Sequence, residues 1–381
     1  MGVLVFFSCV RGDKRQLFIV RRQSGGSGGA ERVATDFSLR LKEDWQVEQV
    51  FAGGMVEGIR LGGSRGPGWW RSLQFAKQVN RLAGKVNPDV VLSLERGPRC
   101  DLYRAGDGVH RRWIEVKYGG SCRWVFNPLN WVYPSQEKQT VRSARLVVAN
   151  SEMVAAELSH AYPEERNKIR VIRNGYDPDR FHPEHSDDSM GLDVPPDSRL
   201  FLFLGSGWER KGLAVAIRFF AEVVREDADF REKGRLIVAG EGDNRSYLAQ
   251  AERLDLKDKV LFLGPVSEPA HLCRSAELMV LPTRYDPFSN ATLEALACGC
   301  PVLTTQTNGA AEVVDPGRTG LLFADSEERN PVADAREFLG TTFAPREAIA
   351  ESVASMTREA ELARYEELLT EIVLTKEGAS E

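Results

Sequence analysis

Short apolar runs recur along the chain, and each is followed by a segment with the spacing of an amphipathic helix. In the first half the runs lie at residues 17–20, 47–53, 89–95, 145–151 and 168–174. In the second half they lie at residues 199–205, 235–240, 259–264, 277–282, 301–305 and 320–323. Runs that are apolar throughout are typical of parallel strands covered by helices on both faces. The two series therefore predict two doubly wound, Rossmann-like α/β domains.

The two series are separated by a segment without periodicity, residues 174–198, which is rich in Pro, Asp, Ser and Gly. Such a composition indicates a linker. We expect an N-terminal domain over residues 1–176 and a C-terminal domain over residues 177–345. The remaining residues, 346–381, carry a long helical pattern. They are expected to form one or two closing helices that pack back toward the N-terminal domain.

Composition is that of an ordinary globular protein. The 381 residues are 42% apolar and 28% charged, which suits two domains with full cores. The net charge of −5 argues against a nucleic-acid partner. The six cysteines include no CxxC pair, so reduced thiols in a cytoplasmic protein are expected. No stretch reaches ~20 apolar residues and the first residues lack a signal-peptide layout, which predicts a soluble or peripheral protein.

Residues 60–86 combine basic and aromatic side chains. Several Lys and Arg residues stand there beside Trp69, Trp70, Leu73 and Phe75. Basic residues beside tryptophans are typical of segments that lie on an anionic membrane surface at the inner face of the cytoplasmic membrane. The alternative is a loop followed by an ordinary surface helix of the first domain.

A glycine-rich segment, residues 21–32, follows the first predicted strand and precedes a helical pattern. Glycines such as Gly28 and Gly29 let a backbone approach a ligand closely, and a helix N-terminus favours anions. The dinucleotide-binding fingerprint is absent from this segment, which argues against a dehydrogenase. A tight turn without a ligand is the alternative.

Two adjacent cations, Arg210 and Lys211, follow the first strand of the second domain at the opening of a helix. Cations at the carboxyl end of a strand suit a diphosphate, because Arg binds it bidentately and Lys acts as a point charge. The alternative is a solvated charge cluster, since Glu209 stands beside them.

Residues 285–305 read as a loop, a short helix and a strand. The helix is predicted to start near Ser289 or Asn290, both good N-caps, with Asp286 in the loop before it and Glu294 on its polar face. Ligands of open α/β sheets bind near the carboxyl ends of the strands, where this unit lies. Free helix amides suit phosphate and carboxylates suit sugar hydroxyls.

Together these residues resemble the retaining GT-B glycosyltransferases of the GT4 group, and within it the lipopolysaccharide-core glucosyltransferases. The resemblance spans residues 17 to 375. Four elements carry it, in the order typical of the family: Gly28-Gly29, the Asn-Gly-x-Asp linker at residues 174–177, Arg210-Lys211-Gly212, and the pair Asp286 and Glu294. Asp286 departs from the family pattern, in which Glu is commoner. The resemblance implies the GT-B fold, in which two Rossmann-like domains face a central cleft.

The resemblance also implies roles for the residues that match the motifs. Gly28 and Gly29 would approach the donor phosphate and the acceptor, and Arg210 and Lys211 would neutralise the departing nucleotide diphosphate. The transferred sugar and its phosphate would be held by Asp286 and by the amides of Phe288, Ser289 and Asn290. Glu294 would bind the ribose hydroxyls, and Val266, in the loop 263–268, would lie near the base.

Residues 101–113 correspond to a first-domain segment that reaches the cleft in this family. Asp107 and His110 are the candidates there to orient or deprotonate the acceptor hydroxyl, because histidine titrates near neutrality. A structural role for either is the alternative.

The sequence Asp177-Pro178-Asp179 imitates the D-x-D metal motif of the other glycosyltransferase fold, but it lies in the predicted linker. Arg210 and Lys211 can stabilise a leaving diphosphate in place of a cation, so catalysis without a metal or other cofactor is expected. The expected function is transfer of a hexose, with glucose from UDP-glucose as the first choice, to a glycan or glycolipid such as lipopolysaccharide core. The alternatives are a sugar-nucleotide epimerase or phosphorylase of the same fold, or a non-catalytic nucleotide-sugar-binding protein.

Overall fold

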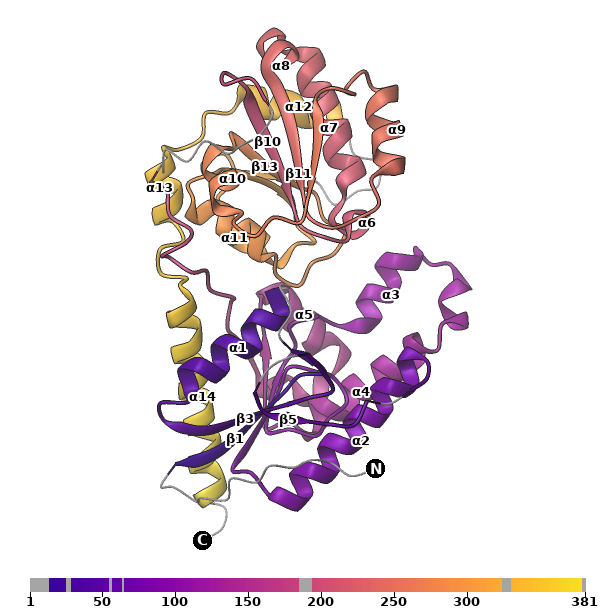
Figure 1. Cartoon of the computed structure of the whole chain (residues 1–381), viewed down its shortest axis with the longest axis vertical. Helices are drawn as coiled ribbons and strands as arrows, with labels where there is room; N and C mark the ends of the chain where they lie inside the picture. The colour runs from indigo at the N-terminus through magenta and orange to yellow at the C-terminus, as the bar shows by residue number, and fades with distance from the viewer. Residues whose placement is uncertain are drawn as a thin grey trace. The chain divides into compact units, whose positions relative to one another are not determined.

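The computed structural model describes residues 14–24, 29–54, 57–63, 65–184, 194–323 and 330–378. The chain forms two compact units, one of residues 1–173 with 361–381 and the other of residues 174–360 (Figure 1). The predicted domain boundary after residue 176 lies three residues from this division. The segment 346–381 was predicted to close on the first domain as a whole, whereas the structure divides it after residue 360.

Unit 1 is built on a parallel sheet with the strand order β5-β3-β1-β6-β7-β8-β9. Its strands are β1 (Arg15–Val20), β3 (Trp45–Phe51), β5 (Ile59–Arg60), β6 (Val90–Ser93), β7 (Leu102–Arg104), β8 (Leu146–Ala149) and β9 (Ile169–Val171). The short strands β2 (Gln23–Ser24) and β4 (Gly53–Gly54) pair separately. Its helices are α1 (Gly29–Leu41), α2 (Gly68–Val86), α3 (His110–Tyr118), α4 (Leu129–Ser143), α5 (Glu152–Ala161) and α14 (Arg358–Gly378), with the 3-10 turns η1 (Cys122–Phe126) and η2 (Pro163–Lys168).

The two faces of this sheet are covered by different helices. Leu17 and Ile19 of β1 face a core shared with α1 and α14, while Phe18 and Val20 face a core shared with α2, α4 and α5. This split follows from the alternation of side chains along a strand. Tyr365 of α14 is fully buried in the first core, where its ring lies 4.7 Å from that of Phe37. The C-terminal helix is therefore part of unit 1.

Unit 2 contains a second parallel sheet, with the order β12-β11-β10-β13-β14-β15. Its strands are β10 (Arg199–Leu204), β11 (Gly234–Ala239), β12 (Val260–Gly264), β13 (Leu278–Leu281), β14 (Val302–Thr305) and β15 (Gly320–Phe323). Its helices are α6 (Trp208–Lys211), α7 (Leu213–Glu226), α8 (Ala228–Lys233), α9 (Arg245–Arg253), α10 (Ala270–Ser275), α11 (Asn290–Ala297), α12 (Pro331–Gly340) and α13 (Arg346–Glu351), with the 3-10 turn η3 (Gly309–Val313). Helix α7 packs with α8, α9 and α12, and α11 packs with α10 and α13 (Figure 1).

Every apolar run that was read as a strand contains one, so the two doubly wound domains are confirmed. The sequence reading missed two strands of the seven-stranded sheet, β5 and β7, which are two and three residues long. In both units the strand order reverses beside the first strand, because β1 lies between β3 and β6 and β10 lies between β11 and β13. Ligands of such sheets bind beyond the carboxyl ends of the strands at this reversal.

Candidate functional site in unit 2

The chain that leaves β10 turns on glycines and brings two cations to the carboxyl ends of the strands. Gly205 lies under the side chain of Lys211, because a Cβ there would come within 3.3 Å of Lys211 Cε. Gly212 has a φ of +81°, and a Cβ there would lie 2.0 Å from the carbonyl oxygen of Pro282, just after β13. Only glycine fits so close an approach in this conformation. These glycines thus allow Arg210 and Lys211 to lie close to the loop that follows β13.

Both cations bind the same carboxylate. Asp286 Oδ2 lies 2.7 Å from Lys211 Nζ and 3.0 Å from Arg210 Nη1, which also donates to the carbonyl oxygen of Tyr285 at 3.0 Å. Lys211 Nζ further donates to the hydroxyl of Ser289 at 3.3 Å. Two positive charges and one negative charge leave the cluster with one net positive charge, which suits a phosphate-bearing ligand.

The charge state of this cluster follows from a balance of burial and charge. Burial alone would raise the pKa of the Asp286 carboxyl, but the nearby charges of Lys211 and Arg210 outweigh burial and hold the pKa below its ordinary value of 3.8. Asp286 is therefore ionised at neutral pH although only 6% of its surface is exposed. The side chains of Lys211 and Asp286 are both about nine-tenths buried, so solvent screens their attraction weakly.

Helix α11 begins at Asn290, with Ser289 as its N-cap, which confirms the predicted start of this helix. The backbone amide of Ser289, however, donates to Asn308 Oδ1 at 3.1 Å. A phosphate could therefore bind this amide only if that hydrogen bond broke, and the role of the amide stays a prediction. The hydroxyl of Ser289 lies instead beside Lys211.

Asn308 holds the loop before α11 in place, and the sequence reading overlooked it. Its side chain is 1% exposed and accepts from the amides of Ser289 and Ala310, both at 3.1 Å. It donates to the hydroxyls of Thr292 and Thr304, both at 3.0 Å. All four hydrogen-bonding positions of one carboxamide are thus used. The available signal was the Asn-Gly dipeptide after the strand at residues 301–305.

The remaining donor-binding candidates lie on neighbouring elements of unit 2. Glu294 is half-buried in α11, and Phe288 is buried just before that helix. Asn290 Oδ1 accepts a hydrogen bond from Asn174 Nδ2 at 2.7 Å, which ties the linker to the start of α11. Val266 is half-buried in the loop between β12 and α10. Their roles toward ribose, phosphate and base stay predictions.

The predicted residues of unit 1 are only partly covered by the structure. Gly28 lies outside the described residues, and Gly29 is the first residue of α1. Asp107 and His110 lie between β7 and the start of α3, around Arg96. Arg96 Nη2 lies 3.9 Å from Asp107 Oδ2, and Asp107 is 56% exposed, so its carboxylate is open to solvent.

His110 is buried and held by hydrogen bonds at both ring nitrogens. Asn130 Nδ2 donates to the carbonyl oxygen of Trp124, so Asn130 Oδ1 is free to act as an acceptor. It accepts a hydrogen bond from His110 Nε2 at 3.3 Å. His110 Nδ1 then faces Arg96 Nη1 at 3.5 Å as the acceptor. Burial, reinforced by the charge of Arg96, lowers the pKa of His110 to about 4. The neutral ring has no unused lone pair in this arrangement, which favours a structural role over the predicted role as a base.

Glu137 is a second residue that the sequence reading missed. It is 1% exposed, lies 3.6 Å from Arg96 Nε, and accepts from the Tyr162 hydroxyl at 2.8 Å and from the His110 amide at 3.1 Å. The sequence could not indicate that this carboxylate in the middle of α4 is buried and paired, because its partners come from segments distant in sequence.

Two further properties concern the described residues only. Within them, no group of three or more His, Cys, Asp or Glu side chains is arranged to hold a metal ion. None of their helices combines the length and apolar character needed to cross a bilayer. Metal independence stays a prediction.

The fold is of the GT-B class, with two Rossmann-like units. The chain is similar to the solved structure of WaaG, a glycosyltransferase involved in lipopolysaccharide biosynthesis, with a TM-score of 0.73 and 20% identity over 92% of this chain and 94% of that one. It is also similar to the Anabaena protein HepE, solved with UDP-glucose, with a TM-score of 0.70 and 20% identity over 94% of this chain and 100% of that one.

Two family models match the sequence, one in each half of the chain. Residues 27–180 match the model described as Glycosyltransferase Family 4, and residues 198–339 match the model described as Glycosyl transferases group 1. The chain therefore carries both domains of a glycosyltransferase of this kind.

The curated relatives resemble only part of the chain. D-inositol 3-phosphate glycosyltransferase 2 of Catenulispora acidiphila is 34% identical over 200 residues, which are 49% of this chain and 46% of that one. The chain thus spans about half the length of the curated relatives it matches.

Proposed function

We propose that the protein transfers a hexose from a UDP-sugar, with glucose as the first choice, to an acceptor hydroxyl and that the anomeric configuration is retained. The observation that carries this proposal is the cluster of Arg210, Lys211, Asp286 and Ser289 at the carboxyl ends of β10 and β13. Its single net positive charge and its hydroxyl suit a diphosphate attached to a sugar.

In this reaction the bond between the anomeric carbon and the diphosphate oxygen breaks, and a bond to the acceptor oxygen forms. Arg210 and Lys211 would stabilise the charge that builds up on the departing diphosphate, which is the largest single contribution expected from such a site. The acceptor proton would pass to a phosphate oxygen on the same face of the sugar, which gives retention without a covalent enzyme intermediate.

The carboxylates would orient the donor and the acceptor. Asp286 would accept hydrogen bonds from the transferred sugar, and Glu294 from the ribose hydroxyls. In unit 1, Asp107 is the exposed carboxylate that could orient the acceptor hydroxyl, whereas His110 has both ring nitrogens engaged. Asp107 is therefore the better candidate of the two.

Two acceptor classes are supported by different comparisons. The similarity of fold to a glycosyltransferase of lipopolysaccharide biosynthesis supports a glycan or glycolipid acceptor, such as lipopolysaccharide core. The names of the curated relatives support a second candidate, an inositol phosphate. Incubation of the protein with UDP-glucose and each acceptor separates the two, because only one should gain a glucosyl group.

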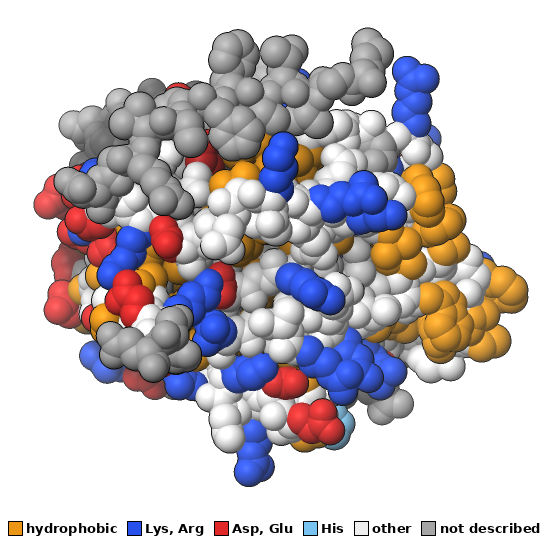
Figure 2. Space-filling view, turned by 90° about the horizontal axis from the view of Figure 1, so that it is seen from below, with side chains coloured by type: hydrophobic (Ala, Val, Ile, Leu, Met, Phe, Trp, Pro, Cys, Tyr) orange, Lys and Arg blue, Asp and Glu red, His pale blue; other side chains and the backbone are white. Residues whose placement is uncertain are grey.

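A lipid-linked acceptor would be reached most readily from a membrane surface, and we propose a peripheral contact of unit 1 with anionic lipid. Exposed large apolar side chains lie on α2, on η1 and at the start of α4. They are Trp70, Leu73, Val125, Phe126 and Trp131, here called the aromatic edge. A Cβ on Gly68, at the start of α2, would lie 3.9 Å from Leu129 Cδ1, at the start of α4. The two helices that carry most of the aromatic edge therefore start side by side. In Figure 2, hydrophobic side chains gather at one edge of the molecule with Lys and Arg side chains nearby.

Product analysis of the wild type and of Lys211→Ala tests the transferase reaction. The wild type should form a glycosidic bond, and Lys211→Ala should lose at least ~100-fold in rate, because about 3 kcal/mol of charge stabilisation is removed. Lys233→Ala, which removes a half-buried lysine at the end of α8 in the same unit, is the matched control. An altered free sugar would indicate an epimerase, and neither transfer nor donor hydrolysis would indicate a non-catalytic binding protein.

A further inference from the structure

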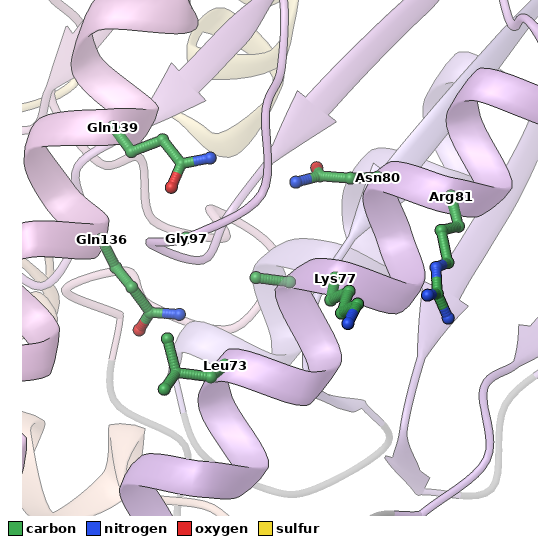
Figure 3. Close-up of a pocket in the computed structure, with 8 residues that line it drawn as sticks. Leu73, Lys77, Asn80, Arg81, Gly97, Gln136 and Gln139 are labelled. Carbon is green, nitrogen blue, oxygen red and sulfur yellow. The ribbon is translucent and has the colours of Figure 1, made fainter.

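Unit 1 contains a cavity of about 370 Å³ between α2 and α4, and neither Asp107 nor His110 belongs to its described lining. Its described lining comes from α2, from α4 and from the loop after β6: Leu73, Ala76, Lys77, Asn80, Arg81, Gly97, Gln136 and Gln139 (Figure 3). The volume falls in the range of small-molecule sites. No carboxylate belongs to this described lining.

Gln136 in this cavity has a buried donor without a partner. The side chain is 3% exposed, and its oxygen accepts from the Ser72 hydroxyl at 2.8 Å. Its nitrogen, Nε2, has no hydrogen-bond partner among the described residues. A buried polar atom of this kind is unfavourable if it stays unsatisfied. A ligand oxygen at the floor of the cavity would satisfy it.

The position of Gln136 depends on Gly97. A Cβ on Gly97 would lie 2.6 Å from Gln136 Nε2 and 3.1 Å from the Cβ of Ala76, and the φ of Gly97 is +114°. Any other residue at position 97 would therefore fill the space beside the amide.

Two further carboxamides face the same space. Figure 3 shows the nitrogen ends of Asn80, Gln136 and Gln139 turned toward the cavity from two helices. For Asn80 the orientation is fixed, because its Oδ1 accepts from the Arg99 amide at 2.8 Å and its nitrogen must point the other way. Convergent N–H donors suit the oxygens of an anion.

The cavity also has two cations at its rim. Lys77 and Arg81 lie one turn apart on α2, and neither forms an ion pair with another described residue. They are exposed, so they can reach an anion that enters between the helices. A carboxylate partner from the protein would have neutralised them.

We propose that this cavity is a second binding site, which takes the phosphate ester of a small polyol. The carboxamides would bind phosphate and hydroxyl oxygens, and Lys77 and Arg81 would supply the opposite charge. No aromatic ring belongs to the described lining, which disfavours a nucleotide base. Leu73 belongs both to the cavity and to the aromatic edge, so the same chemistry can come from a lipid headgroup or from a free phosphate ester.

Binding of glycerol 1-phosphate and of phosphatidylglycerol vesicles to the full chain tests the site. The key variant is Asn80→Asp, which keeps the acceptor for the Arg99 amide but replaces the nitrogen that faces the cavity by an anionic oxygen. Binding should weaken by at least ~10-fold. Lys85→Gln is the matched control, because it changes the charge of α2 by the same amount at a residue outside the lining. Its binding should stay within about twofold of the wild type, since only diffuse attraction is lost.

The two binding measurements, with glycerol 1-phosphate and with phosphatidylglycerol vesicles, identify the source of the ligand. Binding of glycerol 1-phosphate alone indicates a free phosphate ester, and binding of the vesicles but not of phosphatidylcholine vesicles indicates a lipid headgroup. The proposal is overturned if the wild type binds neither probe, or if Asn80→Asp and Lys85→Gln bind equally. UDP-glucose binding, measured on the same variants, reports on unit 2, so failure of this site and failure of the proposed transferase reaction are distinguishable.

Discussion

The substitution Asp286→Asn tests whether one carboxylate holds the two cations of the proposed donor site. It removes the only negative charge that contacts Lys211 Nζ at 2.7 Å and Arg210 Nη1 at 3.0 Å within the described cluster. Lys211 would then be a nearly buried cation without a counter-ion, because only 10% of its side chain is exposed.

The cost of this change can be placed between two limits. Removal of one partner of a buried ion pair costs about 3–5 kcal/mol. Two features lower that figure here, because Arg210 is 35% exposed and can turn to solvent, and the amide oxygen of the variant can still accept from Lys211. We expect a loss of about 2–3 kcal/mol in the free energy of unfolding, or roughly 4–12 °C in Tm for a unit of this size.

A nucleoside diphosphate should reverse part of this loss, because its phosphates can take the place of the missing carboxylate. We expect UDP to bind Asp286→Asn about tenfold more tightly than the wild type, whereas transfer from UDP-glucose slows. Calorimetry gives the affinities, and thermal unfolding with and without UDP gives the stabilities. Asp229→Asn, at an exposed ion pair of α8, has the same change in charge and should alter neither quantity by much.

The reasoning fails if Asp286→Asn is as stable as the wild type, since the carboxylate would then not be needed as a counter-ion. It also fails if UDP binds the variant more weakly. In that case the arrangement that Asp286 imposes on the cations would matter more than the charge it removes from the phosphate site.

Two further changes test other parts of the structure. Gly212→Ala should destabilise unit 2 by more than ~2 kcal/mol and weaken UDP binding. The reason is that φ is +81° and the new Cβ would lie 2.0 Å from the carbonyl oxygen of Pro282. If the variant is as stable as the wild type, this close approach is refuted. His110 has a pKa of about 4 in the folded protein against 6.5 ordinarily, so between these values the unfolded state binds the extra proton and stability falls as the pH falls. His110→Gln should make the free energy of unfolding less dependent on pH, by up to ~1.4 kcal/mol per pH unit. Urea unfolding of the wild type and the variant from pH 7 to 4 measures this dependence. An equal pH dependence of the two proteins would show that the ring is not buried as described.

The sequence predicted the fold well because the strands are buried on both faces. Each run of four to seven apolar residues, such as 277–282, can be recognised without knowledge of its neighbours. The start of α11 was also predictable, since Ser289 and Asn290 carry a local capping signal. Strand β7 escaped because three residues give no period, and its stability comes from pairing with β6 and β8.

The charged residues of the site could be predicted from the sequence, but the ion pairs and hydrogen bonds between them could not. The adjacent Arg210 and Lys211 and the later Asp286 were all recognised as candidates. Nothing in the local sequence indicated that both cations bind that carboxylate, because the contact spans more than 70 residues. The role of Asn308 was hidden for the same reason, since four partners on separate elements define it.

The position of Asp286 suggests why a site for a diphosphate contains a carboxylate at all. Without it, burying Lys211 would cost more than a single hydroxyl contact could offset, and the lysine would turn to solvent. With it, the lysine is held at a fixed place before any ligand arrives, and the cluster still has two cationic side chains for one carboxylate. Charges that are positioned in advance need no reorganisation during the reaction, which is the condition under which they stabilise a transition state most. In the proposed reaction the carboxylate would therefore weaken the binding of the product diphosphate and at the same time favour turnover.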